Sequence, residues 1–427
     1  MSYRISHPTK VLKGCIELTA SKSESNRALI IQALCEEKFE IKNLATAEDT
    51  RVLKEILAKV KANTSIEIET YDVGAAGTTM RFLTAFLATR KGVNCILTGS
   101  ERMKNRPIKI LVDALRDLGA DIEYAEKEGY PPLRIKGKEL DGGEVLIDGN
   151  VSSQYITALL LVAPTLRNGL TLKFNDAVTT SVPYINMTRK MMEEFGITFL
   201  NWFYKSVGDS IIIKREDYHI KTKDYIYEVE GDWSSASYWY AFAALAKKID
   251  NFSIKGLKQN SLQGDDIVNG ICSHNFGVET KYIDGGILLT KGGQKESVFT
   301  YNFYASPDIA QTVAVVVGAL GIPSTFTGLH TLRIKETDRT LALKNELAKI
   351  GVEVEIVNDD KIKINTKQLV QQSSPIATYE DHRMAMAFAP LAMIQDSITI
   401  DHPEVVKKSY PDFWKDLKKV GFEIEEI

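Results

Sequence analysis

Residues 231–246 read G-D-W-S-S-A-S-Y-W-Y-A-F-A-A-L-A, a polar turn that runs directly into an apolar helix built of small residues. Five other stretches share this pattern and begin at Thr19, Gly74, Gly149, Ala305 and Thr378. Successive copies lie 55, 75, 82, 74 and 74 residues apart, measured between Lys22, Gly77, Ser152, Ser234, Asp308 and His382. One pattern that returns at a nearly constant step indicates an internal repeat.

A second pattern alternates with the first. Charged amphipathic helices end in an apolar residue and a glycine, and an alternating strand follows each of them. These glycines are spaced by 77, 81, 74 and 70 residues, at Gly119, Gly196, Gly277, Gly351 and Gly421. A glycine here predicts a left-handed residue that closes the helix. Residues 47–62 form a degenerate copy without the glycine, followed by a strand-like SIEIE at 65–69.

Each repeat therefore predicts a strand, a small-residue helix, a strand, a charged helix and two further strands. A chain of 427 residues is too long for one ordinary core. We expect two domains of three repeats: residues 1–20 with 229–427, and residues 21–228. The stretch 221–232 reads as a crossover, and the weak N-terminal strand at 3–18 suits either half. The small-residue helices, apolar all round, are expected to be buried.

The composition excludes several classes of protein. Hydrophobic residues make up 44% and charged residues 26% of the chain, as in globular domains. A net charge of -3 argues against a nucleic-acid binder, which would be basic. The N-terminus lacks a signal-peptide core, and no apolar run approaches the length of about 18 residues needed to span a membrane. Four scattered cysteines indicate free thiols, so we expect a cytoplasmic protein.

Cations gather at several helix starts. Helix N-termini present unpaired N–H groups and the positive end of a dipole, and so bind anions. In L332-R-I-K-E-T-D-R339 we expect Lys335 and Arg339 to share one helix face. Taken alone, this stretch would be read as a solvated, ion-paired helix start. The stretch 378–387 places His382 and Arg383 in a first turn, which is unfavourable unless an anion binds there.

Further cations lie at or near other starts. Lys22 and Arg27 flank three serines, Arg81 follows a glycine-rich turn, and Lys408 precedes the last helix. Arg106 stands before Pro107, which is predicted at the first position of a helix. Together these cations predict a site for a strongly anionic ligand.

Few acids accompany the cations. Asp308 is read equally well as the N-cap of the helix that follows it or as a catalytic carboxylate, and Glu336 shares this ambiguity. The sequence has no His/Cys cluster, no HExxH and no carboxylate box with metal spacing. We therefore expect no metal.

Ten motifs, in order and over essentially the whole chain, resemble the 5-enolpyruvylshikimate-3-phosphate synthase family. They are S21-K-S-x-S-N-R27, G77-T-x-M-R81, R102-M-K-x-R-P-I108, D148-G-x-V-S-S-Q154, S181-V-P-Y184, G231-D-x-S-S-A-S-Y238, P307-D308, R333-I-K-E-T-D-R339, Y379-x-D-H-R-M-A385 and K408-S-Y-P-D412.

This resemblance implies an α/β, two-domain enolpyruvyl transferase fold. Each domain would have three βαβαββ repeats, with the active site in the interdomain cleft. It implies transfer of the enolpyruvyl group of phosphoenolpyruvate to the 5-hydroxyl of shikimate 3-phosphate, with release of phosphate and without a cofactor. These two small molecules would be the only partners of a monomer that binds neither nucleic acid nor membranes.

The resemblance also implies roles for individual residues. Asp308 corresponds to the base near the 5-hydroxyl, and Glu336 and Lys22 to the proton-transfer groups. The phosphoenolpyruvate site corresponds to Lys22, Gly77, Arg106, Gln154, Arg339, Arg383 and Lys408. The shikimate 3-phosphate site corresponds to Lys22, Ser23, Arg27, Ser152, Ser153, Gln154, Ser181, Tyr184, Asp308 and Lys335. Arg81 and His382 are expected to support the site.

Two positions depart from the family pattern, because Ala75 and Thr331 stand where asparagine is usual. Two other functions stay open. The sister transferase that acts on UDP-N-acetylglucosamine typically carries a loop cysteine, and the stretch R102-MKNRPI lacks one. A non-catalytic phosphometabolite-binding protein is disfavoured, because anion binding alone would not favour carboxylates such as Asp308 and Glu336.

Overall fold

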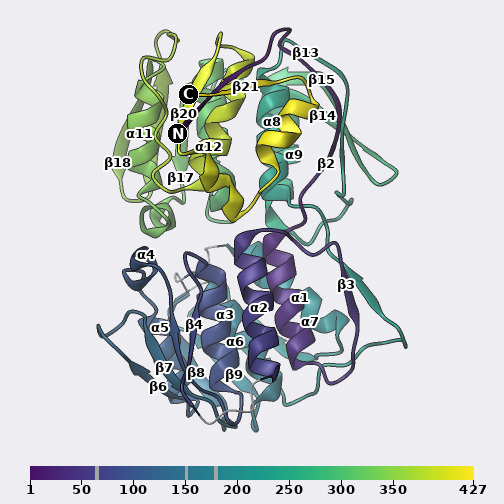
Figure 1. Ribbon diagram of the computed structural model, residues 1–427, viewed down its shortest axis with the longest axis vertical. Helices are drawn as coiled ribbons and strands as arrows, with labels where there is room; N and C mark the ends of the chain where they lie inside the picture. Colours follow the sequence, from purple (N-terminus) through teal and green to yellow (C-terminus); the bar gives the residue numbers. More distant parts are fainter. Residues whose placement is uncertain (63–66, 150–151, 177–180) are drawn as a thin grey trace. The chain divides into compact units, whose positions relative to one another are not determined.

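The computed structural model describes residues 1–62, 67–149, 152–176 and 181–427 (Figure 1). The chain divides into two compact units, which we call unit 1 (Met1–Ser21 with Glu230–Ile427) and unit 2 (Lys22–Val229). These limits differ by one residue from the expected domain limits. The N-terminal segment contributes to unit 1 alone, through β1 (Ser2–Ser6) and β2 (Val11–Glu17).

Unit 1 contains three copies of the repeat. In the first, β2 lies parallel to the strand after the small-residue helix, in the sheet order β14-β15-β13-β2. The second has the order β16-β17-β19-β18. The first copy comprises α8 (Trp233–Leu245), β13 (Lys248–Lys255), α9 (Val268–Asn275), β14 (Phe276–Ile283) and β15 (Gly286–Lys295). The second comprises β16 (Phe299–Asn302), α10 (Ala310–Leu320), β17 (Ser324–Thr327), α11 (Arg339–Ala348), β18 (Val352–Asn358) and β19 (Lys361–Thr366).

The third repeat of unit 1 is completed by the N-terminus. Strand β1 lies between β20 and β21, antiparallel to both, where the other repeats place their own last strand. A single parallel bridge between Ile376 and Ile400 stands in for the first strand. The elements of this repeat are α12 (His382–Phe388), β20 (Ile398–Asp401), α13 (Phe413–Lys419) and β21 (Glu423–Glu426).

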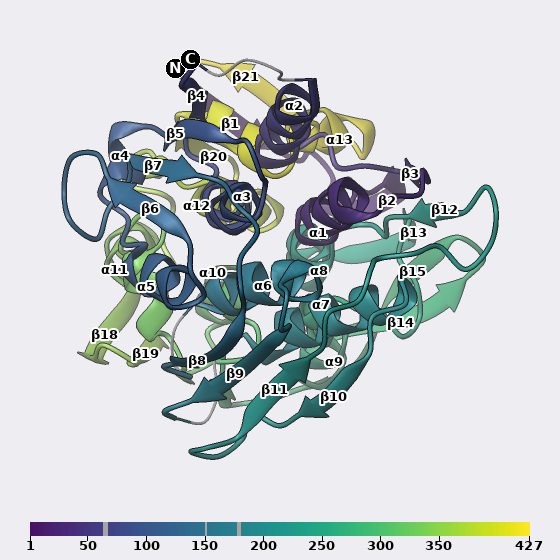
Figure 2. The same ribbon diagram turned by 90° about the horizontal axis from the view of Figure 1, so that it is seen from below.

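Unit 2 contains two full repeats and a degenerate one. The full repeats have the sheet orders β4-β5-β7-β6 and β10-β11-β9-β8 (Figure 2). Their elements are β4 (Glu69–Asp72), α3 (Gly77–Ala88), β5 (Asn94–Thr98), α4 (Glu101–Lys104), α5 (Lys109–Asp117), β6 (Asp121–Tyr124), β7 (Leu133–Lys136), β8 (Gly143–Ile147), α6 (Ser153–Val162), β9 (Leu170–Phe174), α7 (Val182–Glu194), β10 (Phe199–Trp202) and β11 (Ser210–Ile213).

The degenerate repeat has two parallel strands in the part that the structure describes. Its elements are α1 (Lys22–Leu34), β3 (Glu40–Lys42), α2 (Glu48–Ala62) and β12 (Ile226–Glu228). The strand expected at 65–69 falls partly on residues 65 and 66, which are outside the described residues, and Glu69 begins β4 of the next repeat.

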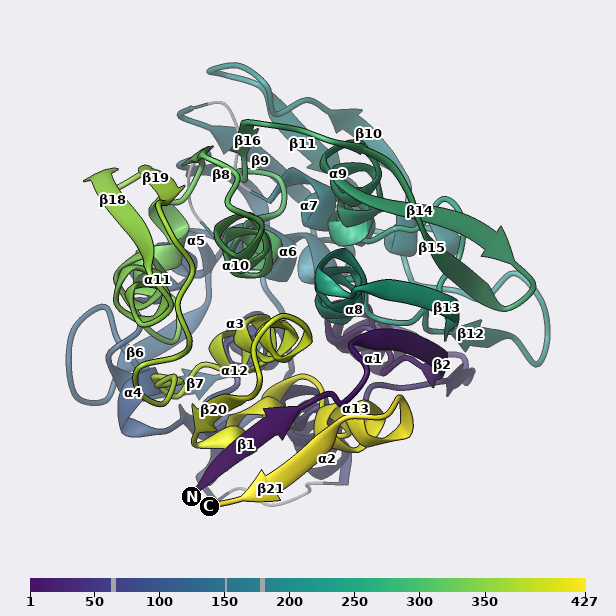
Figure 3. The ribbon, with the colours of Figure 1, turned by 90° about the horizontal axis from the view of Figure 1, so that it is seen from above.

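The small-residue helices form the centre of each unit, as predicted. In unit 1, α8, α10 and α12 pack against one another, and the sheets lie outside them (Figure 3). In unit 2, α1, α3 and α6 do the same. All 13 residues of α8 are buried, including Trp233 and Trp239. Helices that are apolar on every side can be buried on every side, which explains their composition. No helix of the described residues is long and apolar enough to cross a membrane.

The five helix-closing glycines all have positive φ, from +65° at Gly277 to +99° at Gly119. Two predicted helix starts are wrong. Pro107 precedes α5 rather than opening it, because Ile108 has a non-helical φ of -139° and is the N-cap of the helix that begins at Lys109.

The second wrong start concerns Lys335 and Arg339, which do not share a helix face. Asp338 accepts a hydrogen bond from the Leu341 N–H and so caps α11 at Arg339. Lys335 follows a 3-10 turn, His330–Ile334, and its backbone is not helical (φ -80°, ψ -146°).

Candidate active site

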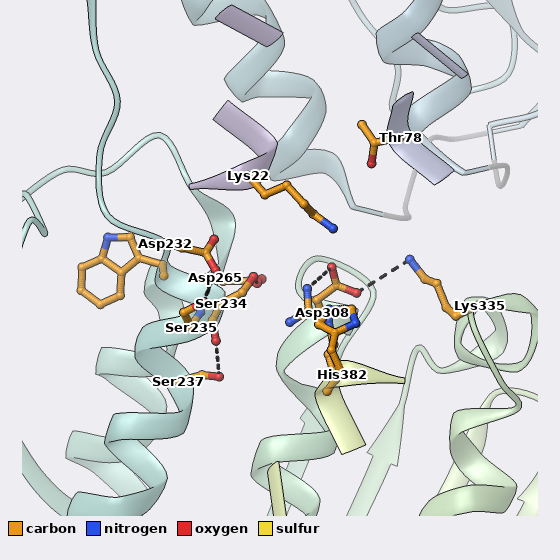
Figure 4. A network of polar contacts seen from close by, with 12 residues as sticks. Lys22, Thr78, Asp232, Ser234, Ser235, Ser237, Asp265, Asp308, Lys335 and His382 are labelled. Atoms are coloured by element: carbon orange, nitrogen blue, oxygen red, sulfur yellow. Dashed lines mark hydrogen bonds and ion pairs between the residues drawn. The ribbon is translucent and has the colours of Figure 1, made fainter. Parts of the chain in front are cut away.

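Asp308 lies at the centre of a cluster of cations in unit 1 (Figure 4). Its carboxylate accepts from Arg383 Nη2 at 2.8 Å and from Arg339 Nη1 at 3.2 Å, and Lys335 Nζ lies 3.7 Å away. The N-cap interpretation of Asp308 is wrong. The residue sits inside a 3-10 turn, Pro307–Ile309, that leads into α10, and its carboxylate points to the cations instead of to backbone N–H groups.

Arg339 connects three carboxylates. The residue is 1% exposed, and its guanidinium donates to Asp381 Oδ2 at 2.7 Å and to Glu336 Oε2 at 3.0 Å, in addition to Asp308. Lys408 Nζ donates to the other Glu336 oxygen at 2.6 Å. Charges of opposite sign therefore alternate through the cluster.

The electrostatics of this cluster favour the charged forms of Asp308 and Arg339. Burial opposes ionisation of Asp308, but Arg383, Lys335 and Arg339 together lower its pKa well below the ordinary value. Burial also disfavours the charged guanidinium of Arg339, but Asp381, Glu336 and Asp308 raise its pKa. The cluster has one more cation than it has carboxylates, and we therefore expect it to bind an added anion. The cations are Lys335, Arg339, Arg383 and Lys408, and the carboxylates are Asp308, Glu336 and Asp381.

Helix α12 begins inside this cluster. Asp381 caps it by accepting from the Arg383 N–H at 2.9 Å, and buried His382 follows, with Nδ1 3.7 Å from Asp381. Arg383 Nη1 also donates to Tyr238 at 3.3 Å, a residue of α8 that the sequence analysis did not select. Burial raises the pKa of Tyr238 to about 12, so its hydroxyl stays protonated. The tyrosine therefore positions Arg383 without adding charge.

The start of α8 is also capped by an aspartate, but unlike the start of α12 it has no histidine or arginine in its first turn. Asp232 accepts from the backbone and hydroxyl of Ser235 at 2.9 and 2.5 Å, and the Ser234 hydroxyl donates to buried Asp265 (Figure 4). The polar side chains at the start of α8 are therefore paired with acidic side chains.

In unit 2, Lys22 is the first residue of α1. Its Nζ lies 3.2 Å from Asp49 Oδ2, and the side chain of Asp49 is only 3% exposed. The sequence analysis missed Asp49, which lies in α2 of the degenerate repeat. Its only sequence signal is an acid in the first turn of a helix, which is common. This buried carboxylate orients the ammonium group of Lys22.

Arg27, which lies between one and two turns further along α1, is held by hydrogen bonds inside unit 2. Four of its N–H groups donate, to Thr188 Oγ1 at 2.8 Å, Thr157 Oγ1 at 3.3 Å, and the carbonyls of Ser23 and Tyr184 at 2.8 and 3.1 Å. Burial lowers its pKa to about 10. Arg27 therefore connects α1 to α6 and α7. Among the described residues these bonds use four of its five N–H groups, which leaves the fifth for the expected contact with shikimate 3-phosphate.

The start of α3 is covered by Arg106. A methyl group added at Gly77 would lie 2.5 Å from Arg106 Nη1, so the guanidinium rests against this glycine. Arg81 supports the arrangement by donating to the carbonyls of Gly77 and Pro107 at 3.3 and 3.0 Å. Gln154, in the first turn of α6, donates to Thr78 at 3.2 Å. One arginine thus faces the N–H groups of a helix start, which is an arrangement that an anion would bridge.

The remaining candidates occupy helix starts in unit 2. Ser152 caps α6 by accepting from the Gln154 N–H at 3.4 Å, and Ser153 is the first residue of that helix. Ser181 precedes α7 in left-handed conformation (φ 54°), its hydroxyl makes no capping bond, and Tyr184 lies in the first turn. Asn150 and Val151 of the D148–Q154 motif, and residues 177–180, are outside the described residues.

Comparisons with known proteins identify the family of the chain as a whole. A model of the family described as EPSP synthase (3-phosphoshikimate 1-carboxyvinyltransferase) matches residues 6–417. The chain belongs to the EPSP synthase family. It is 46% identical to a 3-phosphoshikimate 1-carboxyvinyltransferase of Bacteroides fragilis, over 100% of this chain and 99% of that one. It is 38% identical to one of Pasteurella multocida, over 96% and 95%.

A solved EPSP synthase from Acinetobacter baumannii has the same fold. It superposes with a TM-score of 0.76 over 100% of both chains, at 21% sequence identity. The predicted fold class is thereby confirmed. The structure also describes the two positions at which the chain departs from the pattern of the EPSP synthase family. Ala75 is exposed before α3, and Thr331 has a buried hydroxyl that lacks a hydrogen-bond partner among the described residues.

The ion pair between Lys22 and Asp49 gives a first prediction for this EPSP synthase family member. Asp49→Asn keeps the shape of the side chain but removes the charge that orients Lys22. We expect turnover to fall about tenfold, with a smaller change in the Michaelis constants. Glu55→Gln in the same helix removes an exposed ion pair with Arg51 and should leave turnover unchanged. Equal rates in the two variants would contradict the role of Asp49.

The contact between Gly77 and Arg106 gives a second prediction. Gly77→Ala fits the helical backbone, but its methyl group must push the Arg106 guanidinium away. We expect the KM for phosphoenolpyruvate to rise about fivefold or more, while the melting temperature changes by less than about 2 °C, because the end of an arginine side chain moves easily. Initial rates at varied phosphoenolpyruvate measure this. Gly270→Ala in α9, where an added methyl meets nothing within 4 Å, is the control. An unchanged KM would contradict the role of Arg106.

Proposed function

We propose that this protein is a 3-phosphoshikimate 1-carboxyvinyltransferase. It transfers the enolpyruvyl group of phosphoenolpyruvate to the 5-hydroxyl of shikimate 3-phosphate and releases phosphate. The observation that carries the proposal is the cluster around Asp308, in which a carboxylate is held among cations, together with full-length similarity to proteins that carry this name. A purely binding site for anions would gain nothing from Asp308 and Glu336.

The binding roles follow from charge. The carboxylate and phosphate of phosphoenolpyruvate would be bound by Arg339, Arg383 and Lys408 of unit 1, and by Lys22, Arg106, Gln154 and the backbone at Gly77 of unit 2. Shikimate 3-phosphate would be bound by hydroxyls and cations. These are Ser23, Arg27, Ser152, Ser153, Ser181 and Tyr184, with Gln154 and Lys22, and Asp308 and Lys335 of unit 1.

The reaction needs a base and an acid. Asp308 accepts the proton of the 5-hydroxyl, whose oxygen then bonds to C2 of phosphoenolpyruvate while Glu336 or Lys22 protonates the methylene carbon. This addition gives a tetrahedral ketal. In the second step the methyl carbon returns a proton and the bond from C2 to the phosphate oxygen breaks. Phosphate leaves, and the positioned cations stabilise its charge.

Substrate binding is expected to activate Asp308. Arg383, Lys335 and Arg339 neutralise this carboxylate, which depresses its pKa and makes it a weak base. A substrate anion that draws these cations away raises the pKa of Asp308 toward its ordinary value. The carboxylate would then become a better proton acceptor when both reactants are present.

The test is phosphate release by the purified protein with phosphoenolpyruvate and either shikimate 3-phosphate or UDP-N-acetylglucosamine as acceptor. We expect release with shikimate 3-phosphate alone. Release with the sugar nucleotide alone would transfer the assignment to the sister enzyme. Release with neither acceptor, when shikimate 3-phosphate binds, would favour the binding protein.

We further propose that the protein acts in the cytoplasm, as a monomer and without a metal or cofactor. The proposal is supported by the sequence resemblance and by the free thiols. Among the described residues, no group of three or more His, Cys, Asp or Glu is placed to hold a metal ion. Light scattering of the pure protein, and the same phosphate assay after dialysis against a chelator, test the last two points.

A further inference from the structure

Unit 2 contains a cavity of about 1030 Å³ at the C-terminal ends of α1, α2 and α3. Its wall is formed by some of the residues in the segments 29–39, 54–61 and 86–94, together with Tyr71. Lys22 and Gly77 lie at the opposite ends of α1 and α3. A 13-residue helix such as α1 is about 20 Å long, so this cavity is separate from the candidate catalytic residues of unit 2.

The wall combines an apolar surface with an excess of positive charge. Leu29, Leu57, Phe86 and other apolar side chains form most of it. Five cations, Lys38, Lys54, Lys61, Arg90 and Lys91, outnumber two acids, Glu36 and Glu37. Within the described part of the chain, none of the five cations lies within 4.0 Å of a carboxylate. Small-molecule sites typically combine apolar walls with a few polar groups in this way.

Arg90 is the least exposed of the five cations. Its guanidinium stacks on the Phe86 ring at 4.6 Å, and its Nε is buried without a hydrogen-bond acceptor among the described residues. The Oδ1 atom of Asn94, also in the wall, is buried without a donor. Two polar atoms of wall residues are therefore buried and unsatisfied within the described part of the chain, which is unfavourable.

The helix C-termini themselves offer a competing explanation, because their carbonyl groups attract cations. Arg90 Nη2 does point to the carbonyl of Ala33, but at 3.5 Å, the outer limit of a hydrogen bond. That contact leaves Nε without an acceptor, and it does not explain four further cations around an apolar hollow.

The cavity belongs to the degenerate repeat. The other two repeats of unit 2 each have a four-stranded sheet, whereas this repeat has β12 and β3 alone in the described part. Within the described residues, this repeat therefore has two strands fewer than each of the others.

We propose that this cavity is a second binding site, for an amphipathic carboxylate with an aromatic body. The carboxylate would accept hydrogen bonds from Arg90 and lie near Lys54 and Lys91, and the aromatic body would pack on Leu57 and Phe86. The proposal is independent of the catalytic assignment.

Titration of the full chain with 2-naphthoate, followed by methyl NMR, tests the proposal. Saturable shifts are expected at the methyl groups of Leu29, Leu57 and Val93, which line the cavity. The neutral analogue 2-naphthol should bind about tenfold more weakly. No saturable shifts, or equal affinity for the two compounds, would overturn the proposal. Equal shifts with inorganic phosphate would also overturn it, by showing a site for bare anions.

Variants locate the carboxylate. Arg90→Gln should lower the affinity for 2-naphthoate about tenfold. The double variant Lys54→Gln/Lys91→Gln, which changes two exposed lysines, should lower it about threefold. Lys59→Gln, in α2 but outside the cavity wall, is the matched control and should leave the affinity unchanged. Retained turnover shows that each variant is folded. If the Lys54/Lys91 double variant and Arg90→Gln both bind as the wild type does, the proposed site is wrong.

Discussion

Asp308→Asn is expected to lower turnover by about 10²- to 10⁴-fold, the range associated with losing a general base. Asparagine has the same shape and keeps an oxygen that can accept from Arg339 or Arg383. It cannot take the proton of the 5-hydroxyl. The variant also removes one negative charge from a cluster that must bind anions. Shikimate 3-phosphate should therefore bind at least as tightly as to the wild type.

Steady-state phosphate release and calorimetric titration with shikimate 3-phosphate measure the two effects separately. Asp359→Asn provides the control, because this side chain is 82% exposed. Turnover within about tenfold of the wild type would remove Asp308 from the role of base. Lost binding together with lost turnover would instead show that Asp308 mainly holds the cations in place.

The depressed pKa of Asp308 also predicts a pH effect on stability. Its pKa in the folded state lies below the unfolded value of about 3.9. The carboxylate therefore stabilises the folded protein above about pH 4, and this contribution is lost as the pH falls through the folded-state value. Asp308→Asn lacks the contribution at every pH. The difference in unfolding free energy between the wild type and the variant should shrink on acidification.

Arg339→Met is expected to destabilise unit 1 by about 3 to 5 kcal/mol and to abolish turnover. The guanidinium is the shared partner of Asp308, Glu336 and Asp381, and its side chain is 2% exposed. Methionine fills a similar volume but leaves three carboxylates close together with one cation fewer. Denaturant unfolding of the wild type and the variant measures the loss.

Arg333→Met in the same motif is the matched control. Arg333 is 38% exposed and pairs with Asp338 and Asp359 at the surface, so its loss should change stability by less than about 1 kcal/mol. If the two variants were equally stable, Arg339 would not be the connecting charge of the cluster. Partial recovery of Arg339→Met at acidic pH would support the electrostatic cause, because protonation relieves the unpaired carboxylates.

The stretch R333-I-K-E-T-D-R339 shows where the sequence is informative and where it is not. Its charges predict an anion site, and Asp338 is a recognisable helix cap. The pattern placed Lys335 on the helix with Arg339, but the cap at Asp338 starts the helix four residues later. Similarly, Asp308 before an apolar helix reads as a cap, whereas its partners Arg383 and Arg339 come from 75 and 31 residues away. Contacts over such separations have no local signal.

The repeat was determined by the sequence alone. Small apolar residues on all faces of one helix type predict burial, and a charged face on the other type predicts exposure, because each depends on local composition. The closing glycines, the helix order and the cations at the starts of α1 and α12 follow in the same way. Only the tertiary structure decided which charges meet. Folding pairs Lys22 with Asp49, surrounds Asp308 with three cations and places Arg27 between helices. The electrostatic environment of a charged side chain is set by the groups that folding brings near it, and these groups lie far away in the sequence.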